Sequence, residues 1–257
     1  MAILFDDVIF GPIKSRRLGI SLGVNLLPTN SKLCNFDCIY CECGWNRKGE
    51  GKKMFNSREE VRTMLEKKLA EMQQEEALPN TITFAGNGEP TMHPEFADII
   101  NDTLALRDKY APNANVSVLS NATMIGREKV LNALLKVDRA ILKLDSGFDE
   151  TVKLIDCPQG SYTVAETVKR MKAFNGKMTL QTMFLKGSYN GKAVDNTTEK
   201  EVNRWLEVLQ EINPQEVMIY TIDRETPAPD LQKVTIEELE QIANRARELG
   251  YKVQVSG

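Results

Sequence analysis

The sequence lacks a surplus of positive charge. Its 33 lysine and arginine residues are outnumbered by 36 aspartate and glutamate residues, which gives a formal net charge of −3, and the two signs are mixed along the chain. A nucleic-acid partner favours a broadly basic surface, so the composition does not indicate one. The chain also lacks any apolar run that approaches the roughly 20 residues of a membrane span. We therefore expect no membrane partner.

The first ten residues, MAILFDDVIF, lack the positive charge of a secretory signal and carry Asp6 and Asp7 instead. We therefore expect a cytoplasmic protein. In that reducing compartment the five cysteines are not expected to form a disulfide framework. Four of them lie within the ten residues from 34 to 43, and this clustering indicates metal or redox chemistry.

Predicted strands alternate with predicted helices from residue 20 onward. Runs rich in Val, Ile and Leu predict the strands, and apolar positions that recur on one helical face predict the helices. The predicted strands span 20–27, 80–86, 114–121, 139–146, 177–185, 216–223 and 251–256. The predicted helices span 57–77, 94–110, 127–137, 163–174, 199–212 and 235–249.

Six strand–helix units of this kind imply right-handed crossovers and a parallel sheet. Six units are fewer than the eight that close a complete (β/α) barrel, so an incomplete, splayed barrel and a doubly wound open sheet both satisfy the pattern. We expect one α/β domain over residues 1–257. Residues 1–19 would form an N-terminal extension, and residues 20–257 would form the six units and a short last strand.

Polar and glycine-rich stretches follow the predicted strands. The cysteine segment follows the first strand, AGNGEPTMHP the second, SNAT the third and YTIDRETPAP the sixth. Lys143 and Asp145 end the fourth strand, and Gln181 and Met183 share a face of the fifth. In parallel α/β folds the chemistry lies at the carboxyl ends of the strands, so we expect the active site at this edge.

The segment KLCNFDCIYCECGW carries Cys34, Cys38 and Cys41 in C-x3-C-x2-C spacing, with Tyr40 before the last cysteine. Thiolates this close in sequence can converge on one compact cluster, and iron–sulfur clusters are normally held by four of them. Three ligands leave one iron open, and an open metal position is where chemistry occurs. The alternatives are a zinc site with Cys43 as the fourth thiolate and a redox dithiol of Cys38 and Cys41.

This cysteine spacing resembles the signature of the radical S-adenosylmethionine (SAM) superfamily, including the aromatic residue before the third cysteine. GNGEP after the second strand resembles the glycine–glycine–glutamate motif of that family. FGPIKSRRLGISLGVNLLP and YTIDRETP resemble a broad subgroup of iron–sulfur oxidoreductases that is related to the wyosine-forming enzymes. The resemblance covers nearly the whole chain. It implies an α/β fold of the partial (β/α)6 TIM-like barrel type, with a parallel sheet and outer helices.

The resemblance also implies two cofactors and the residues that hold them. A [4Fe-4S] cluster would be ligated by Cys34, Cys38 and Cys41. The residues implied to contact SAM are Tyr40, Asn87, Gly88, Glu89, Ser120, Asn121, Lys143, Asp145, Gln181 and Tyr220.

Two of the implied SAM contacts have structural alternatives. Glu89 would accept a hydrogen bond from the SAM ammonium group, or it caps the helix that begins near Pro94. Asp145 would accept hydrogen bonds from the ribose hydroxyls, or it forms an ion pair with Lys143 inside the core.

Other polar residues near these segments keep two interpretations. Arg16 and Arg17 form a basic entry segment that binds an anionic group of the substrate or is solvated. Asp223 and Arg224 border the substrate or form a loop salt bridge. His93, the only histidine, is expected to cap or pack rather than to catalyse.

The stretch 43–55 contains glycines and basic residues without periodicity. We expect a mobile loop beside the cluster that covers the substrate or docks an electron donor such as a flavodoxin or ferredoxin, and a solvated loop is the alternative. Cys157, far from this stretch, is expected to be a small buried side chain.

The resemblance implies reductive cleavage of SAM to methionine and a 5′-deoxyadenosyl radical, which abstracts hydrogen from a substrate in an oxidoreductase or lyase reaction. We expect this substrate to be a small molecule. The alternatives are tRNA modification of the wyosine type and glycyl-radical activation of a partner protein. The acidic balance and the lack of a separate N-terminal cysteine set disfavour tRNA. A zinc or electron-transfer protein is the non-catalytic alternative.

Overall fold

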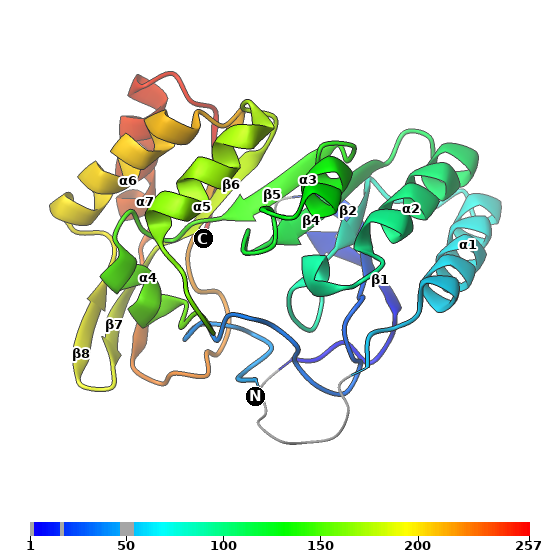
Figure 1. Cartoon of the computed structure of the whole chain (residues 1–257), viewed down its shortest axis with the longest axis horizontal. Coiled ribbons are helices and arrows are strands. Elements are labelled where there is room, and N and C mark those ends of the chain that lie inside the picture. Colours follow the sequence, from blue (N-terminus) through cyan, green and yellow to red (C-terminus); the bar gives the residue numbers. More distant parts are fainter. Residues whose placement is uncertain (1–2, 16–17, 47–53) are drawn as a thin grey trace.

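The computed structural model describes residues 3–15, 18–46 and 54–257, and Figure 1 shows their arrangement. The strands are β1 (Ile9–Ser15), β2 (Gly19–Val24), β3 (Thr81–Phe84), β4 (Asn115–Ser120), β5 (Arg139–Lys143), β6 (Thr179–Met183), β7 (Leu185–Tyr189), β8 (Lys192–Asp195), β9 (Glu216–Tyr220), β10 (Leu231–Lys233) and β11 (Val253–Ser256). The α-helices are α1 (Arg58–Gln74), α2 (Phe96–Tyr110), α3 (Glu128–Leu134), α4 (Asp149–Ile155), α5 (Val164–Met171), α6 (Glu199–Ile212) and α7 (Ile236–Glu248). Short 3-10 helices span Pro90–Met92 (η1) and Lys172–Phe174 (η2). Within the described ranges no helix has both the length and the apolar character that a bilayer crossing requires.

Eight strands form one curled sheet in the order β1-β2-β3-β4-β5-β6-β9-β11. β1 pairs antiparallel with β2, and the remaining neighbours pair in parallel. The helices cover the outer side of this sheet, and the long loops gather along its lower edge in Figure 1. The predicted α/β partial barrel with a parallel sheet and outer helices is confirmed. The doubly wound alternative, which has helices on both faces, does not form.

Local sequence signals begin the helices. Ser57 is the N-cap of α1, and its side chain accepts a hydrogen bond from the Glu60 backbone N–H. Thr235 and Glu238 form a reciprocal capping box at the start of α7. These caps satisfy backbone N–H groups that have no partner within the helix, and so they help to determine where α1 and α7 start.

The two faces of the sheet carry different side chains because strand residues alternate in direction. Leu22 and Ile82 belong to the large apolar core between the sheet and the helices. Their neighbours Ser21 and Thr83 lie on the other face, where the Ser21 hydroxyl donates to Thr83 Oγ1 at 2.8 Å. The interior of the partial barrel is therefore partly polar, with hydroxyl groups that bond to one another.

Part of the predicted N-terminal extension is an edge strand. β1 contains Gly11 and Pro12, and the pairing register with β2 shifts between Phe10 and Ile13. Proline lacks a backbone N–H and is tolerated at a sheet edge or a bulge, so this strand can contain a Gly-Pro pair that normally indicates a turn. Arg16 and Arg17 follow this strand and lie outside the described residues.

A second sheet, in the order β10-β7-β8, was missed by the sequence analysis. β7 and β8 form a hairpin whose turn residues Asn190 and Gly191 both have positive φ, at 50° and 73°. Asn-Gly between two short strands is a strong hairpin signal. The sequence analysis did not assign a hairpin there because it followed the regular alternation of strands and helices. The sequence analysis predicted no element between residues 146 and 163, where α4 forms.

Candidate active site

A cavity of about 310 Å³, here called the central cavity, lies at the carboxyl ends of the parallel strands. Its wall contains the three predicted metal ligands, Cys34, Cys38 and Cys41. Of the predicted SAM contacts it contains Tyr40, Gly88, Glu89, Ser120, Asn121, Lys143, Gln181 and Tyr220. These residues come from the cysteine loop and from the ends of β3, β4, β5, β6 and β9, so the fold brings distant segments of the chain to one place.

Gly88 connects the cysteine loop to the loop after β3. Leu33 and Gly88 form an isolated parallel bridge, in which Leu33 N donates to Asn87 O at 2.8 Å and Glu89 N donates to Leu33 O at 3.2 Å. Gly88 has a φ of +142°, and a Cβ atom built on it would lie 1.8 Å from Leu33 O. Only glycine allows this approach, which places Cys34 beside the loop that carries Glu89.

Glu89 lies at the centre of a buried hydrogen-bond network. It is 2% exposed and caps the 3-10 helix η1. Its Oε1 accepts from Thr91 N at 3.0 Å and Ser120 Oγ at 2.9 Å, and its Oε2 accepts from Asn121 N at 2.6 Å. Burial raises the pKa of Glu89, whereas these donors favour the carboxylate. Glu89 therefore lines the cavity and caps η1. It does not cap the helix after Pro94, because the N-cap of α2 is Glu95.

Asn121 extends this network to the cysteine loop. Its Nδ2 donates to Asn35 Oδ1 at 2.6 Å and lies 3.6 Å from Cys34 Sγ. The Phe36 backbone N–H also donates to Cys34 Sγ, at 3.4 Å. Donors of this kind stabilise a thiolate, and they orient the first cysteine of the loop relative to the end of β4.

Asn87 does not belong to the wall of the central cavity. Its side chain accepts from Phe5 N at 2.8 Å and donates to Phe5 O and Pro28 O, both at 2.8 Å. It fastens the N-terminal segment to the loop after β3, and direct contact of its side chain with SAM stays a prediction.

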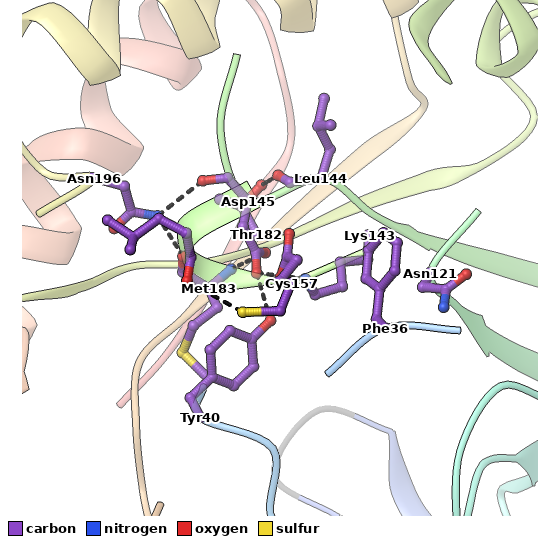
Figure 2. Close-up of polar contacts among 12 residues, drawn as sticks. Phe36, Tyr40, Asn121, Lys143, Leu144, Asp145, Cys157, Thr182, Met183 and Asn196 are labelled. Atoms are coloured by element: carbon purple, nitrogen blue, oxygen red, sulfur yellow. Dashed lines mark hydrogen bonds and ion pairs between the residues drawn. The ribbon is translucent and has the colours of Figure 1, made fainter. Parts of the chain in front are cut away.

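Lys143 and Asp145 form the buried ion pair that was the alternative to ribose binding. Figure 2 shows Tyr40, Lys143 and Asp145 pointing toward one another. Lys143 Nζ lies 2.7 Å from Asp145 Oδ2 and also pairs with Asp156, and the Tyr40 hydroxyl donates to Asp145. Although burial alone lowers the pKa of Lys143, the two carboxylates raise it well above its ordinary value. A role of Asp145 toward the ribose stays a prediction.

The backbone around β6 also holds Asp145. Its Oδ1 accepts from Met183 N at 2.9 Å, and Asn196 Nδ2 donates to the Asp145 carbonyl at 2.8 Å (Figure 2). Asp145 itself is 1% exposed and does not line the central cavity, whereas Lys143 does. Asp145 therefore holds Tyr40 and Lys143 in the cavity wall.

Cys43 lies beside Cys41 but faces a second cavity. This outer cavity has a volume of about 470 Å³ and is lined by Lys32, Cys41, Cys43, Trp45 and Glu225, among others. Cys41 is part of both cavity walls, whereas Cys43 is absent from the wall of the central cavity. The adjacent Cys43 thiol and the nearby Lys32 ammonium lower the pKa of Cys41 to about 6, although burial raises it. Burial, by contrast, raises the pKa of Cys34 to about 12.

The remaining predictions have plain structural outcomes. His93 caps and packs as expected: its Nδ1 accepts from Glu95 N at 3.0 Å, and its ring meets Phe55 edge to face. Arg224 forms a loop salt bridge with Glu42 at 2.6 Å, at the wall of the central cavity. Cys157 is partly exposed and not buried. Of the stretch 43–55, residues 47–53 lie outside the described part of the chain.

A partial barrel with three cysteines and a buried glutamate at its carboxyl edge defines a class of α/β protein with a thiolate site. Residues 31–199 match the model of the Radical SAM superfamily, and the chain belongs to this family. A UPF0026 protein of Methanocaldococcus jannaschii is 30% identical over 219 residues, which cover 83% of this chain and 63% of that protein. The chain thus spans less than two thirds of this relative.

Two solved structures share the fold. A radical SAM methyltransferase from Sphaerobacter thermophilus superposes with a TM-score of 0.67 at 13% identity, over 92% of this chain and 65% of that one. Streptococcus suis SuiB bound to S-adenosylmethionine superposes with a TM-score of 0.62 at 13% identity, over 88% of this chain and 49% of that one. Radical SAM proteins are enzymes that use a [4Fe-4S] cluster and SAM and need an electron donor.

The residues present fit such a cluster by the chemistry of their donor set. Three thiols of one loop reach the wall of one cavity, and N–H donors accompany Cys34. In the described ranges no three His, Cys, Asp or Glu side chains are already gathered as a metal site. The loop therefore fits a cluster in the number and type of its ligands, three cysteine thiols, and in their placement along one cavity wall.

The sequence analysis missed three charged residues of this site. Lys32 is 2% exposed and precedes the first cysteine, Asp37 bonds to it, and Asp156 pairs with Lys143. In sequence these residues look like ordinary surface charges. The local signals that were available are the closeness of Lys32 to Cys34 and of Asp37 to Cys38.

We predict that Gly88→Ala prevents the cysteine loop from seating against the loop after β3. The added methyl group would clash with Leu33 O, so iron content after reconstitution should fall by more than half and the thermal midpoint should drop. Gly160→Ala is the matched control, because Gly160 also has a positive φ, +113°, but has no atom within 4 Å of the added Cβ. Equal iron content in the two variants would contradict the proposed role of Gly88.

Proposed function

We propose that Cys34, Cys38 and Cys41 hold a [4Fe-4S] cluster and that SAM binds in the central cavity. The observation that supports this proposal is the presence of the three cysteines and Glu89 in the wall of one cavity. When bound, the two cofactors supply reductive cleavage of the SAM carbon–sulfur bond, which yields a 5′-deoxyadenosyl radical for hydrogen abstraction from a substrate. The reaction would be of the oxidoreductase or lyase type.

Glu89 supplies a negative charge for the ammonium end of SAM. Its Oε1 accepts hydrogen bonds from Thr91 and Ser120, and its Oε2 accepts one from Asn121 N. A carboxylate oxygen can accept about two hydrogen bonds. Within the described part of the chain Oε2 therefore retains acceptor capacity for an ammonium group. Because the side chain is already held by four donors, its position does not depend on SAM.

Lys143, Gln181 and Met183 form another part of the cavity wall, at the ends of β5 and β6. Lys143 and Gln181 are register partners in the β5–β6 pair, and Gln181 and Met183 point to the same face of β6. All three lie in the wall of the central cavity, together with Tyr220 at the end of β9. They offer a cation, an amide and apolar surface, which suit the carboxylate and nucleoside parts of SAM.

The substrate would enter between the cysteine loop and the loop after β9. Glu42 and Arg224 form a salt bridge there and are 43% and 54% exposed at their side chains, and Asp223 lines the same wall. The central cavity, at about 310 Å³, is near the lower end of the range for ligand sites. These charges favour a polar substrate, which we propose is a small molecule, and an electron donor such as a flavodoxin or ferredoxin would supply the electron.

Anaerobic reconstitution with iron and sulfide tests the cluster assignment. We predict a brown protein that forms 5′-deoxyadenosine when it is reduced in the presence of SAM. Cys41→Ala should lose the colour and at least about 90% of this product. Cys157→Ala, a matched cysteine outside the loop, should retain both. A colourless zinc protein, or a cluster that leaves SAM intact, would exclude the catalytic proposal.

Glu89→Gln tests the SAM site separately from the cluster. The substitution removes the charge and turns one acceptor oxygen into a donor, so the dissociation constant of SAM should rise at least about tenfold, or about 1.4 kcal/mol. Iron content should stay unchanged. Thr91→Ala removes one hydrogen-bond donor of the carboxylate but keeps its charge, so it should weaken SAM binding less than Glu89→Gln does. Calorimetric titration of the reconstituted proteins gives both constants, and normal affinity in Glu89→Gln would show that this residue is misassigned.

The substrate class is tested by hydrogen transfer. In a screen of deuterated small metabolites, at least one compound should transfer deuterium into 5′-deoxyadenosine. Deuterated tRNA should transfer none. Binding of tRNA should be weak at physiological salt, as expected for a chain with a net charge of −3. Deuterium transfer from tRNA would favour the tRNA-modifying alternative instead.

A further inference from the structure

Lys32 is a buried cation at the side of the cysteine loop that faces the outer cavity. It is 2% exposed, and its ammonium group donates to Gly44 O at 2.8 Å and to Asp37 Oδ1 at 3.2 Å. It lies in the wall of the outer cavity with Cys41, whose backbone oxygen accepts from Gly44 N at 2.8 Å. Most of the cost of burying this charge is offset by these partners, which hold the ammonium group at one place.

Lys32 approaches the cysteines from the side away from the SAM site. It lies in the wall of the outer cavity and is absent from the wall of the central cavity, whereas Cys41 belongs to both. Although burial lowers the pKa of Lys32, the cysteines raise it above its ordinary value, Cys41 more than Cys38 and Cys34. A charge in this position acts on all three thiolates without touching a ligand in the central cavity.

A cluster bound by three thiolates becomes more negative when it accepts an electron. A fixed positive charge close to these sulfur atoms stabilises the reduced form more than the oxidised form, and the low polarity of a buried site strengthens this effect. The charge near a cluster and the hydrogen bonds to its sulfurs are known to set its reduction potential.

We propose that Lys32 is a positioning residue that raises the reduction potential of the cluster, so that an external one-electron donor can reduce it. This inference rests on the proposed cluster assignment. The electron comes from the donor, and the lysine itself is neither oxidised nor deprotonated. Lys32 also spans the loop from Asp37 to Gly44, and so it fixes the sulfur atoms and its own charge in one arrangement.

Asp37 opposes the effect of Lys32. Its Oδ1 lies 3.2 Å from Lys32 Nζ and accepts from Asn46 N at 2.8 Å and Asn46 Nδ2 at 3.1 Å. Its negative charge partly cancels the field of the lysine at the cysteines. An asparagine at this position keeps an acceptor oxygen of the same shape but removes the charge. Removing the charge of Lys32 and removing the charge of Asp37 should therefore shift the reduction potential of the cluster in opposite directions.

The experiment is an anaerobic redox titration of the reconstituted proteins, followed by electron paramagnetic resonance of the reduced cluster. Lys32→Met should reduce the equilibrium constant for one-electron reduction at least about tenfold, which corresponds to a potential about 59 mV lower. Asp37→Asn should shift the potential upward. Lys136→Met, which removes an exposed lysine bound to Asn101, is the matched control for net charge and should leave the potential unchanged. SAM affinity should stay the same in all three variants.

An unchanged potential in Lys32→Met with an intact cluster would overturn the inference. If Lys32→Met takes up no cluster, Asp37→Asn decides: a higher potential supports the inference, and an unchanged or lower potential overturns it. Failure of the wild-type protein to assemble a cluster that cleaves SAM would refute the proposed function itself. A wild-type protein that is active, with no shift in the variants, would refute only the role of Lys32.

Discussion

The site depends on one close backbone contact, between Leu33 ahead of the cysteines and Gly88 after β3. Two hydrogen bonds, Leu33 N to Asn87 O and Glu89 N to Leu33 O, join these loops as a short parallel bridge. The contact determines where Cys34 lies relative to Glu89, and the network through Ser120 and Asn121 then follows from it. A loop of three cysteines has little structure of its own, so its geometry comes from the sheet edge to which it is joined.

Buried charges form the second level of organisation. Lys143 lies between Asp145 and Asp156, Glu89 is held by donors from two loops, and Lys32 is held beside the cysteines. An unpaired charge at any of these positions would strongly destabilise the fold, and each of these three side chains has partners. The partners make the charges rigid, and a rigid polar site needs little reorganisation when a charged cofactor binds.

Particular elements show how far sequence reasoning reaches. The strand–helix order was predictable because strands buried beneath helices have apolar runs and the helices have caps such as Ser57 and Thr235. β1 and the β7–β8 hairpin were missed, since a Gly-Pro pair and an Asn-Gly turn are local features that a regular repeat of units hides. The pairing of Lys143 with Asp156 was also missed, because α4 lies in a stretch without clear periodicity.

The amino-acid sequence by itself determined the family and the order of the six strand–helix units, and it supplied candidate site residues, because these depend on residue type and local spacing. The tertiary structure decided what each residue contacts. In the folded chain Asn87 bonds to Phe5 in the N-terminal segment, and Asp145 pairs with Lys143 and Tyr40. Lys32 bonds to Gly44 O, at the side of the cysteine loop that faces the outer cavity. Such contacts join segments far apart in the chain, and they arise only when the curled sheet brings the ends of its strands together.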